Sequence, residues 1–188
     1  MDKDLFEAIG LSSLGRIRFE SDHPEQEGWK FGTNRNTPKD PIPQFRMVED
    51  SHFGKSLDIN LPAGHFMDHR VNKTEIKSTY IEFVIKPERD CVLYTELQIV
   101  GHNKPPVDNK WLAVRPGTDE PKAHGQGKIE WDIYVPESPM AGGWIKLGVD
   151  LPDQVKKTFG REGWQFDHLK KFRIRGNLSI AEIRMHKT

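Results

Sequence analysis

The sequence predicts an all-β protein folded as an antiparallel β-sandwich with one or two short helices. Apolar and polar residues alternate with a period of two through many short segments, as in strands with one face in a core and the other in water. Glycine, proline, asparagine and aspartate separate these segments at spacings typical of a sandwich. Strands do not alternate with long helices, which disfavours a parallel, nucleotide-binding sheet.

The last third of the chain carries the clearest strand pattern. Apolar residues alternate with arginines over 172–175, a Gly-Asn pair follows, and apolar residues resume over 178–185. This pattern predicts two half-buried antiparallel strands joined by a turn. Ile180 and Ile183 are separated by three positions instead of two, which predicts a β-bulge near Ala181.

Strands are also expected in the alternating or β-branched segments before this pair. Residues 80–85 and 91–100 are expected to be central because they are rich in β-branched and aromatic side chains. Residues 65–70 are interpreted as a polar connection. The other predicted strands are 16–20, 29–31, 45–48, 56–60, 110–115, 129–135 and 142–151, so the total is about ten.

One helix is predicted over 152–160, between the closing strands. Asp150 is a suitable N-cap, and Pro152 suits the first helical turn. Val155 and Phe159 are four residues apart and would therefore share one face of this helix.

The length favours a single domain. With 188 residues and 21.7 kDa, the chain is long enough for one sizeable core. Residues 15–188 are predicted to form the sandwich, and residues 1–14 either a short helix or a linker within a larger multidomain chain. The loop over 32–44 is long and rich in threonine, asparagine and proline, and such loops are often functional.

Charge and composition exclude some classes of partner. Lys plus Arg and Asp plus Glu are equal at 28 each, so no net field attracts nucleic acid or an anionic membrane. No apolar run is long enough to cross a bilayer, and the N-terminus lacks a signal-peptide pattern. The single cysteine, Cys91, excludes an internal disulfide framework and fits a reducing compartment, so the cytoplasm is favoured while other compartments stay open.

The chain contains an early Gly28-Trp29 strand, a hairpin at 54–59, a strand at 143–151 and a terminal pair at 174–180. Together these segments resemble the galactose-binding-like jelly rolls, which include many carbohydrate-binding modules. The resemblance implies a jelly-roll sandwich that binds sugars without catalysis, on loops at one end or on a concave sheet face. It also implies a structural calcium ion near an early turn, as in many members of that family.

Tryptophans are the first candidates for contact with a carbohydrate. A sugar ring has apolar C–H faces that stack on indole, while its hydroxyls bond to nearby polar groups. Trp29 and Trp111 are predicted to line the site, whereas Trp131 and Trp144 alternate with core residues and are expected inside. The polar residues predicted to contribute are His65, His69, Arg70, His102 and Asn103.

Two groups of residues have side chains that suit a metal ion. His65, Asp68 and His69 would suit a transition metal if the segment turned on itself, but an extended strand would hold the histidines too far apart. A hard cation such as calcium prefers oxygen ligands. The acidic residues predicted to bind calcium at turns are Glu20, Asp22, Glu25 and Asp50.

Three functions stay open on the sequence alone. The first is carbohydrate recognition without catalysis, since no serine sits in a nucleophile elbow and Cys91 has no histidine beside it. The second is an intracellular protein-interaction or sensor domain of a larger protein, with a protein as its ligand. The third is a small glycoside-acting enzyme whose carboxylate pair comes from Glu82, Glu96 and Glu130.

Alternation along strands also predicts a group of exposed arginines. They would suit an anionic ligand if they converged on one surface. Otherwise they protect strand edges and keep the surface soluble. These residues are Arg70, Arg115, Arg173 and Arg175.

Overall fold

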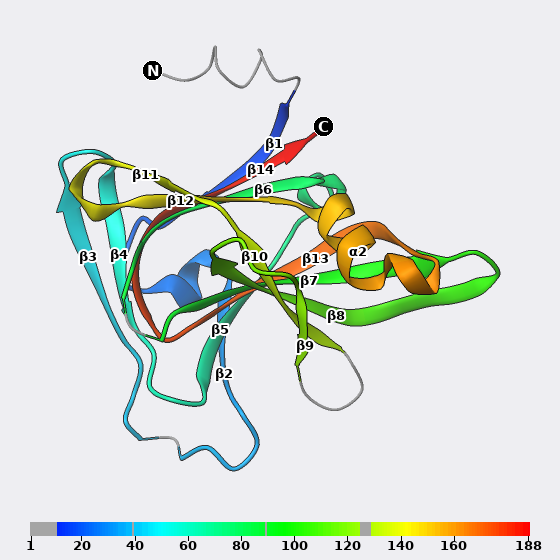
Figure 1. Ribbon diagram of the computed structural model, residues 1–188. Helices are drawn as coiled ribbons and strands as arrows, with labels where there is room; N and C mark the ends of the chain where they lie inside the picture. The colour runs from blue at the N-terminus through cyan, green and yellow to red at the C-terminus, as the bar shows by residue number, and fades with distance from the viewer. Residues whose placement is uncertain (1–10, 39, 89, 125–128) are drawn as a thin grey trace.

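The computed structural model folds the chain into two β-sheets packed face to face (Figure 1). It describes residues 11–38, 40–88, 90–124 and 129–188. Most neighbouring strands are antiparallel, so the predicted antiparallel sandwich is confirmed. No described helix is long and apolar enough to span a membrane.

Each sheet draws its strands from both halves of the chain. Sheet A contains β1 (Ser12–Arg18), β3 (Gln44–Asp50), β4 (Gly54–Asn60), β6 (Tyr80–Pro87), β11 (Glu137–Pro139), β12 (Ile145–Asp150) and β14 (Asn177–Lys187), in the order β11-β12-β6-β14-β4-β3 with β1 beside β14. Sheet B contains β2 (Trp29–Thr33), β5 (His65–Arg70), β7 (Val92–Gly101), β8 (Lys104–Pro116), β9 (Lys122–His124), β10 (Glu130–Val135) and β13 (Trp164–Arg175), in the order β2-β5-β13-β7-β8-β10-β9.

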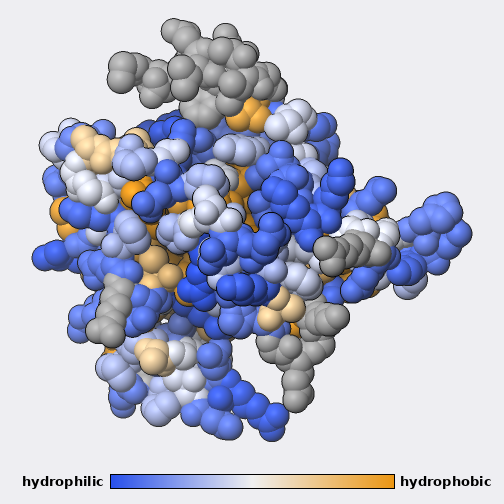
Figure 2. All heavy atoms as spheres, in the orientation of Figure 1, coloured by the Kyte–Doolittle hydropathy of each residue, from blue (hydrophilic) through white to orange (hydrophobic). Residues whose placement is uncertain are grey.

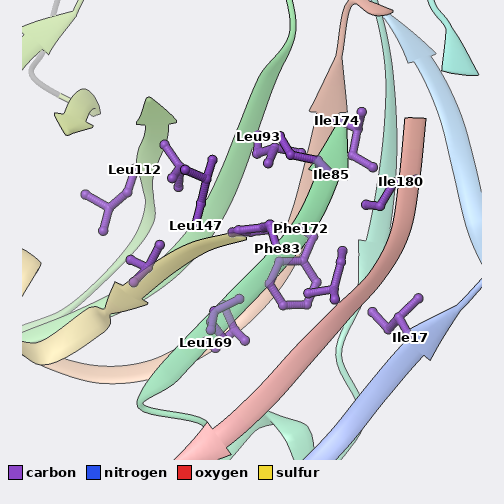
Figure 3. Close-up of a cluster of buried hydrophobic side chains, with 14 of the residues drawn as sticks. Ile17, Phe83, Ile85, Leu93, Leu112, Leu147, Leu169, Phe172, Ile174 and Ile180 are labelled. Carbon is purple, nitrogen blue, oxygen red and sulfur yellow. The ribbon is translucent and has the colours of Figure 1, made fainter. Parts of the chain in front are cut away.

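The core lies between the two sheets and is built from the inward positions that the alternation predicts (Figure 3). Phe83 of sheet A and Phe172 of sheet B are both fully buried, and their rings meet edge to face with centroids 5.8 Å apart. Ile85 and Ile174 add aliphatic contacts to the same layer. Buried aromatic and aliphatic surface of this kind is the main source of stability in a sandwich.

The predicted helix is present as α2 (Leu151–Phe159). Asp150 caps it, because its carboxylate accepts a hydrogen bond from the backbone N–H of Asp153 at 2.9 Å. Phe159 is buried, and its ring lies 5.5 Å from that of Trp131. The described 3₁₀ turns are η1 (Pro24–Glu27), η2 (Glu75–Lys77), η3 (Ala141–Gly143) and η4 (Gly160–Glu162).

Segment 65–70 forms a strand, so its interpretation as a polar connection is wrong. β5 lies between β2 and β13 in sheet B. It alternates as a strand should, but two of its core-facing positions are the histidines 65 and 69, while Phe66 and Asp68 face outward. The segment therefore shows no apolar periodicity.

Two further expectations are corrected. Residues 1–14 were expected to be a short helix or a linker, but residues 12–14 belong to β1, which pairs with β14. Residues 1–10 lie outside the described residues. β10 runs parallel to β8, with Glu130 opposite Trp111, where an antiparallel neighbour was expected.

The last passage of the chain from sheet B to sheet A occurs at the turn between β13 and β14. Gly176 occupies this turn with φ of +76°, a backbone conformation that disfavours residues with a Cβ. A Cβ at this position would also collide with the backbone oxygen of Asp90. Further along β14 the register shifts between Ile180 and Glu182, which confirms the predicted bulge.

The outer face of sheet A carries a buried polar network. Glu82, only 2% exposed, lies 3.1 Å from the Nζ of Lys146 and 3.3 Å from the Nε2 of His186. Glu182 lies 3.1 Å from the Nε of Arg16. Burial lowers the pKa of His186 below the ordinary value of 6.5, although the carboxylate of Glu82 opposes this shift.

We expect the protein to lose stability as the pH falls below about 6.5, the pKa of an unfolded histidine. In that range the unfolded chain takes up a proton at His186 and the folded chain does not, so protonation favours unfolding. Burial lowers the pKa of His69 as well, against the carboxylate of Glu75, and adds to the effect. The check is the unfolding free energy in urea at about pH 7.5 and about pH 5.5.

The matched variants are His186→Gln and His102→Gln. His186→Gln should reduce the difference between the two pH values, because it removes one buried proton acceptor. His102 is exposed, so His102→Gln should leave the difference unchanged. An equal pH dependence in His186→Gln and in the natural sequence would contradict this account.

Candidate functional site

The outer face of sheet B carries aromatic and charged side chains in three rows that run across the strands. Residues directly opposite each other on paired strands point to the same side of a sheet. The strand registers therefore place the members of each row side by side. The first row is Arg70, Lys171, Glu96, Trp111 and Glu130; the second is Asp68, Arg173, Tyr94, Ala113 and Asp132; the third includes Arg175, Arg115 and Tyr134.

The centre of this surface is the indole of Trp111, which is partly exposed. The ring of Tyr94 meets it edge to face with centroids 6.2 Å apart. The guanidinium of Arg173 lies 4.4 Å from the indole centroid, and the Nζ of Lys171 lies 4.9 Å from it. We call the set of Phe66, Tyr94, Trp111, Lys171, Arg173 and Arg175 the Trp111 face.

Carboxylates and rings hold the two central cations in place. The Nε and Nη2 of Arg173 donate to the two carboxylate oxygens of Asp68 at 2.7 and 2.8 Å. The same guanidinium lies 3.7 Å from the ring centroid of Phe66, so it packs against both Phe66 and Trp111. Lys171 pairs with Glu96 at 2.8 Å. These contacts preorganise the polar groups around the indole.

Arg175 differs from its neighbours because no described carboxylate lies within ion-pair distance of it. Its Nη2 donates to the Oδ1 of Asn34 at 3.3 Å, and its Nε is buried without a hydrogen-bond partner. The guanidinium lies 5.1 Å from the ring centroid of Tyr94 and 5.6 Å from that of Phe66. Burial raises the pKa of Tyr94, which therefore presents a neutral hydroxyl here.

A pocket of about 370 Å³ adjoins Arg175 at the end of the sandwich where β13 turns into β14. Tyr94 and Arg175 line it from the sheet, and Asn34 lines it from the loop between β2 and β3. The imidazole of His65 also lines it; this residue is 5% exposed, and its Nδ1 has no hydrogen-bond partner.

Trp29 is a core residue, so its prediction as a sugar platform is wrong. It is only 2% exposed, and its ring stacks on Phe19 with centroids 5.5 Å apart. The ring of His69 lies 5.0 Å from that of Trp29, on the same inward side, which removes His69 from the surface site as well. Trp144 is buried as expected, and its indole donates to Asp50 at 3.0 Å. Trp131 is partly buried against the core.

His102 and Asn103 do not share a site with Trp111. They occupy the turn of the β7–β8 hairpin, which projects from the sandwich at the right of Figure 1 and appears there as a hydrophilic protrusion in Figure 2. Trp111 lies seven positions beyond Lys104, the first residue of β8, which is about 23 Å along a strand. His102 and Asn103 were predicted to join the site because they lie close to Trp111 in sequence, and this prediction is wrong.

The structure brings the other predicted residues into two places. Arg70 shares a row with Trp111, and His65 lines the adjoining pocket. All four predicted arginines lie on the outer face of sheet B, since Arg115 shares the third row with Arg175. Tyr94 and Lys171 are site residues that sequence reasoning missed. The outward position of Tyr94, next to the inward Leu93, was the available signal.

The four predicted calcium ligands are not brought together. No three acidic, histidine or cysteine side chains of the described segments are grouped as a metal ion would require. Asp50 instead accepts hydrogen bonds from the backbone N–H groups of His52 and Phe53, and Glu20 pairs with Lys55 at 3.3 Å. The other two predicted ligands, Asp22 and Glu25, lie near His23 at 3.5 and 3.4 Å. A structural calcium ion stays a prediction from the sequence.

Two other predicted clusters are also divided by the fold. His65 and His69 face inward while Asp68 faces outward to Arg173, so the three cannot ligate one ion. Glu82 belongs to sheet A, whereas Glu96 and Glu130 lie in sheet B on either side of Trp111. Glu82 therefore cannot form the predicted carboxylate pair with either of the others, whereas Glu96 and Glu130 lie in one row on the same face of sheet B.

Comparison with known proteins identifies no family and yields only distant structural similarities. No protein-family model matches the chain, and no curated protein matches it in sequence. The chain is similar to TmCBM27, a carbohydrate-binding module described for specific mannan recognition, with 12% identity, a TM-score of 0.37 and coverage of 95% of this chain and 98% of that one. It is also similar to the xylan-binding module CBM15, with 9% identity, a TM-score of 0.37 and coverage of 94% and 98%.

Proposed function

We propose that this protein is a non-catalytic carbohydrate-recognition module that binds a glycan on the outer face of sheet B. The observation that carries the proposal is the partly exposed indole of Trp111, surrounded by polar groups that are already held in place. A sugar ring can stack its C–H face on the indole. Its hydroxyls can then bond to Lys171 and to the outward carboxylates.

The size of the surface suits a chain of sugars. The first row crosses the neighbouring strands β5, β13, β7, β8 and β10. Strands lie about 4.8 Å apart, so this row extends over about 20 Å. A surface of that length can contact several sugar residues of an oligosaccharide, and not only one.

Recognition without hydrolysis is supported by the state of the acidic residues on this face. Glu96 is 2% exposed and paired with Lys171, and Asp132 pairs with Arg115 at 3.0 Å. These carboxylates are engaged in fixing cations. We therefore expect them to position polar groups and not to exchange protons with a glycosidic bond.

The test is a panel of soluble polysaccharides that includes mannan and xylan, the polymers named for the two similar structures. We expect at least one glycan to raise the midpoint of thermal unfolding in proportion to its concentration. Release of reducing sugar, measured in parallel, should stay at background. If no polysaccharide shifts the midpoint, the proposal fails; if bound glycan is cleaved, its non-catalytic part fails.

A further inference from the structure

We infer that the glycan is acidic and that Arg175 binds the carboxylate of a uronate residue at the pocket beside the Trp111 face. This inference rests on the proposed function and adds the chemical class of the ligand. It depends on the charge of Arg175, on the polar groups of the pocket and on the continuity of the two surfaces.

The charge of Arg175 is available to a ligand. Arg173 and Lys171 are neutralised by Asp68 and Glu96, whereas the described partner of Arg175 is the neutral amide of Asn34. A guanidinium presents two parallel N–H groups that match a carboxylate. Its Nε is buried without a hydrogen-bond partner, and such a group gains most from an added acceptor.

The pocket offers further groups that suit a sugar acid. His65 is buried, and its unpartnered Nδ1 can donate to a carboxylate or a hydroxyl when it carries the proton, and can accept from a hydroxyl when it does not. Asn60 and Asn177 add amide groups that both donate and accept. Asp90 also lines the pocket, but it is beyond ion-pair distance from Arg175 and has an interaction of its own.

Tyr94 joins the pocket to the Trp111 face. Its ring lines the pocket, lies under Arg175 and meets Trp111 edge to face. The ring of Tyr94 thus contacts both Trp111 and Arg175. A glycan that stacks on the indole can therefore reach the guanidinium with a neighbouring sugar residue.

The experiment measures the affinity of the whole chain for glucuronoxylan, polygalacturonate and alginate, each against its carboxyl-reduced form. We expect at least one acidic polymer to bind about tenfold more tightly than its reduced form, the difference of one charge-assisted hydrogen bond. In Arg175→Gln the two forms should bind equally. Arg175→Lys keeps the positive charge but lacks the two parallel N–H groups of a guanidinium. It should therefore recover part of the preference that Arg175→Gln loses.

The control is Arg46→Gln, which removes the same charge from β3 of sheet A, where the side chain is 78% exposed and pairs with Asp58. It should keep the full preference for the acidic form. Circular dichroism and the unfolding midpoint establish that each variant is folded. Dextran sulfate tests for attraction by charge alone and should not depend on Arg175.

Several results would overturn the inference. They are equal binding of the acidic and reduced forms by the natural sequence, an unchanged preference in folded Arg175→Gln, or binding of dextran sulfate with the same dependence on Arg175. Binding of neutral glycans without any acidic preference would leave the proposed function standing. Binding of no glycan at all would remove both.

Discussion

Replacement of Trp111 by alanine is expected to abolish detectable glycan binding while the sandwich stays folded. A central, partly exposed tryptophan that stacks on its ligand typically contributes about 2 kcal/mol or more, or about 30-fold in Kd. Truncation also leaves Lys171 and Arg173 without the ring over which they lie. The measurement is isothermal titration calorimetry with the polysaccharide that shifts the unfolding midpoint most.

The matched control for Trp111 is Trp164→Ala. Trp164 is also partly buried, and the Nζ of Lys104 lies 4.9 Å from its ring centroid, so the local contacts are alike. It pairs with Gly101 at the far end of the β7–β8 hairpin, away from the rows of the Trp111 face. Equal loss of affinity in the two alanine variants would place the glycan elsewhere.

The fold could be predicted where one side of a strand is consistently apolar. β10 and the β13–β14 pair follow this rule, and the bulge near Ala181 was visible as one extra residue between Ile180 and Ile183. The rule fails in β5, where histidines occupy inward positions. It also cannot distinguish a parallel neighbour from an antiparallel one, which is why the pairing of β10 with β8 was missed.

The candidate site could be predicted only in part, because its members meet through strand register. Trp111 was identified from its residue type, but Lys171 and Arg173 reach it from β13, across β7. A single sequence specifies the alternation within each strand and not which residues of two strands lie opposite each other. Trp29 shows the reverse error, since an apolar ring beside charged residues was interpreted as exposed and is 2% exposed.

Replacement of Phe172 by alanine is expected to lower the free energy of unfolding by about 3–5 kcal/mol, the usual cost of removing a buried phenylalanine side chain. Phe172 has no exposed surface and meets Phe83 across the interface of the two sheets (Figure 3). Its strand lies between β5 and β7, so neighbouring strands limit the collapse of the cavity. Urea denaturation at neutral pH gives the measurement.

Phe31→Ala is the control for the same change at the edge of sheet B. Phe31 is 42% exposed and packs on Phe45 with ring centroids 5.1 Å apart, so its loss should cost about 1 kcal/mol or less. Similar losses in the two variants would contradict the assignment of the core.

The inward position of Phe172 also orients Lys171 and Arg173 outward, so we expect Phe172→Ala to weaken glycan binding through the geometry of β13.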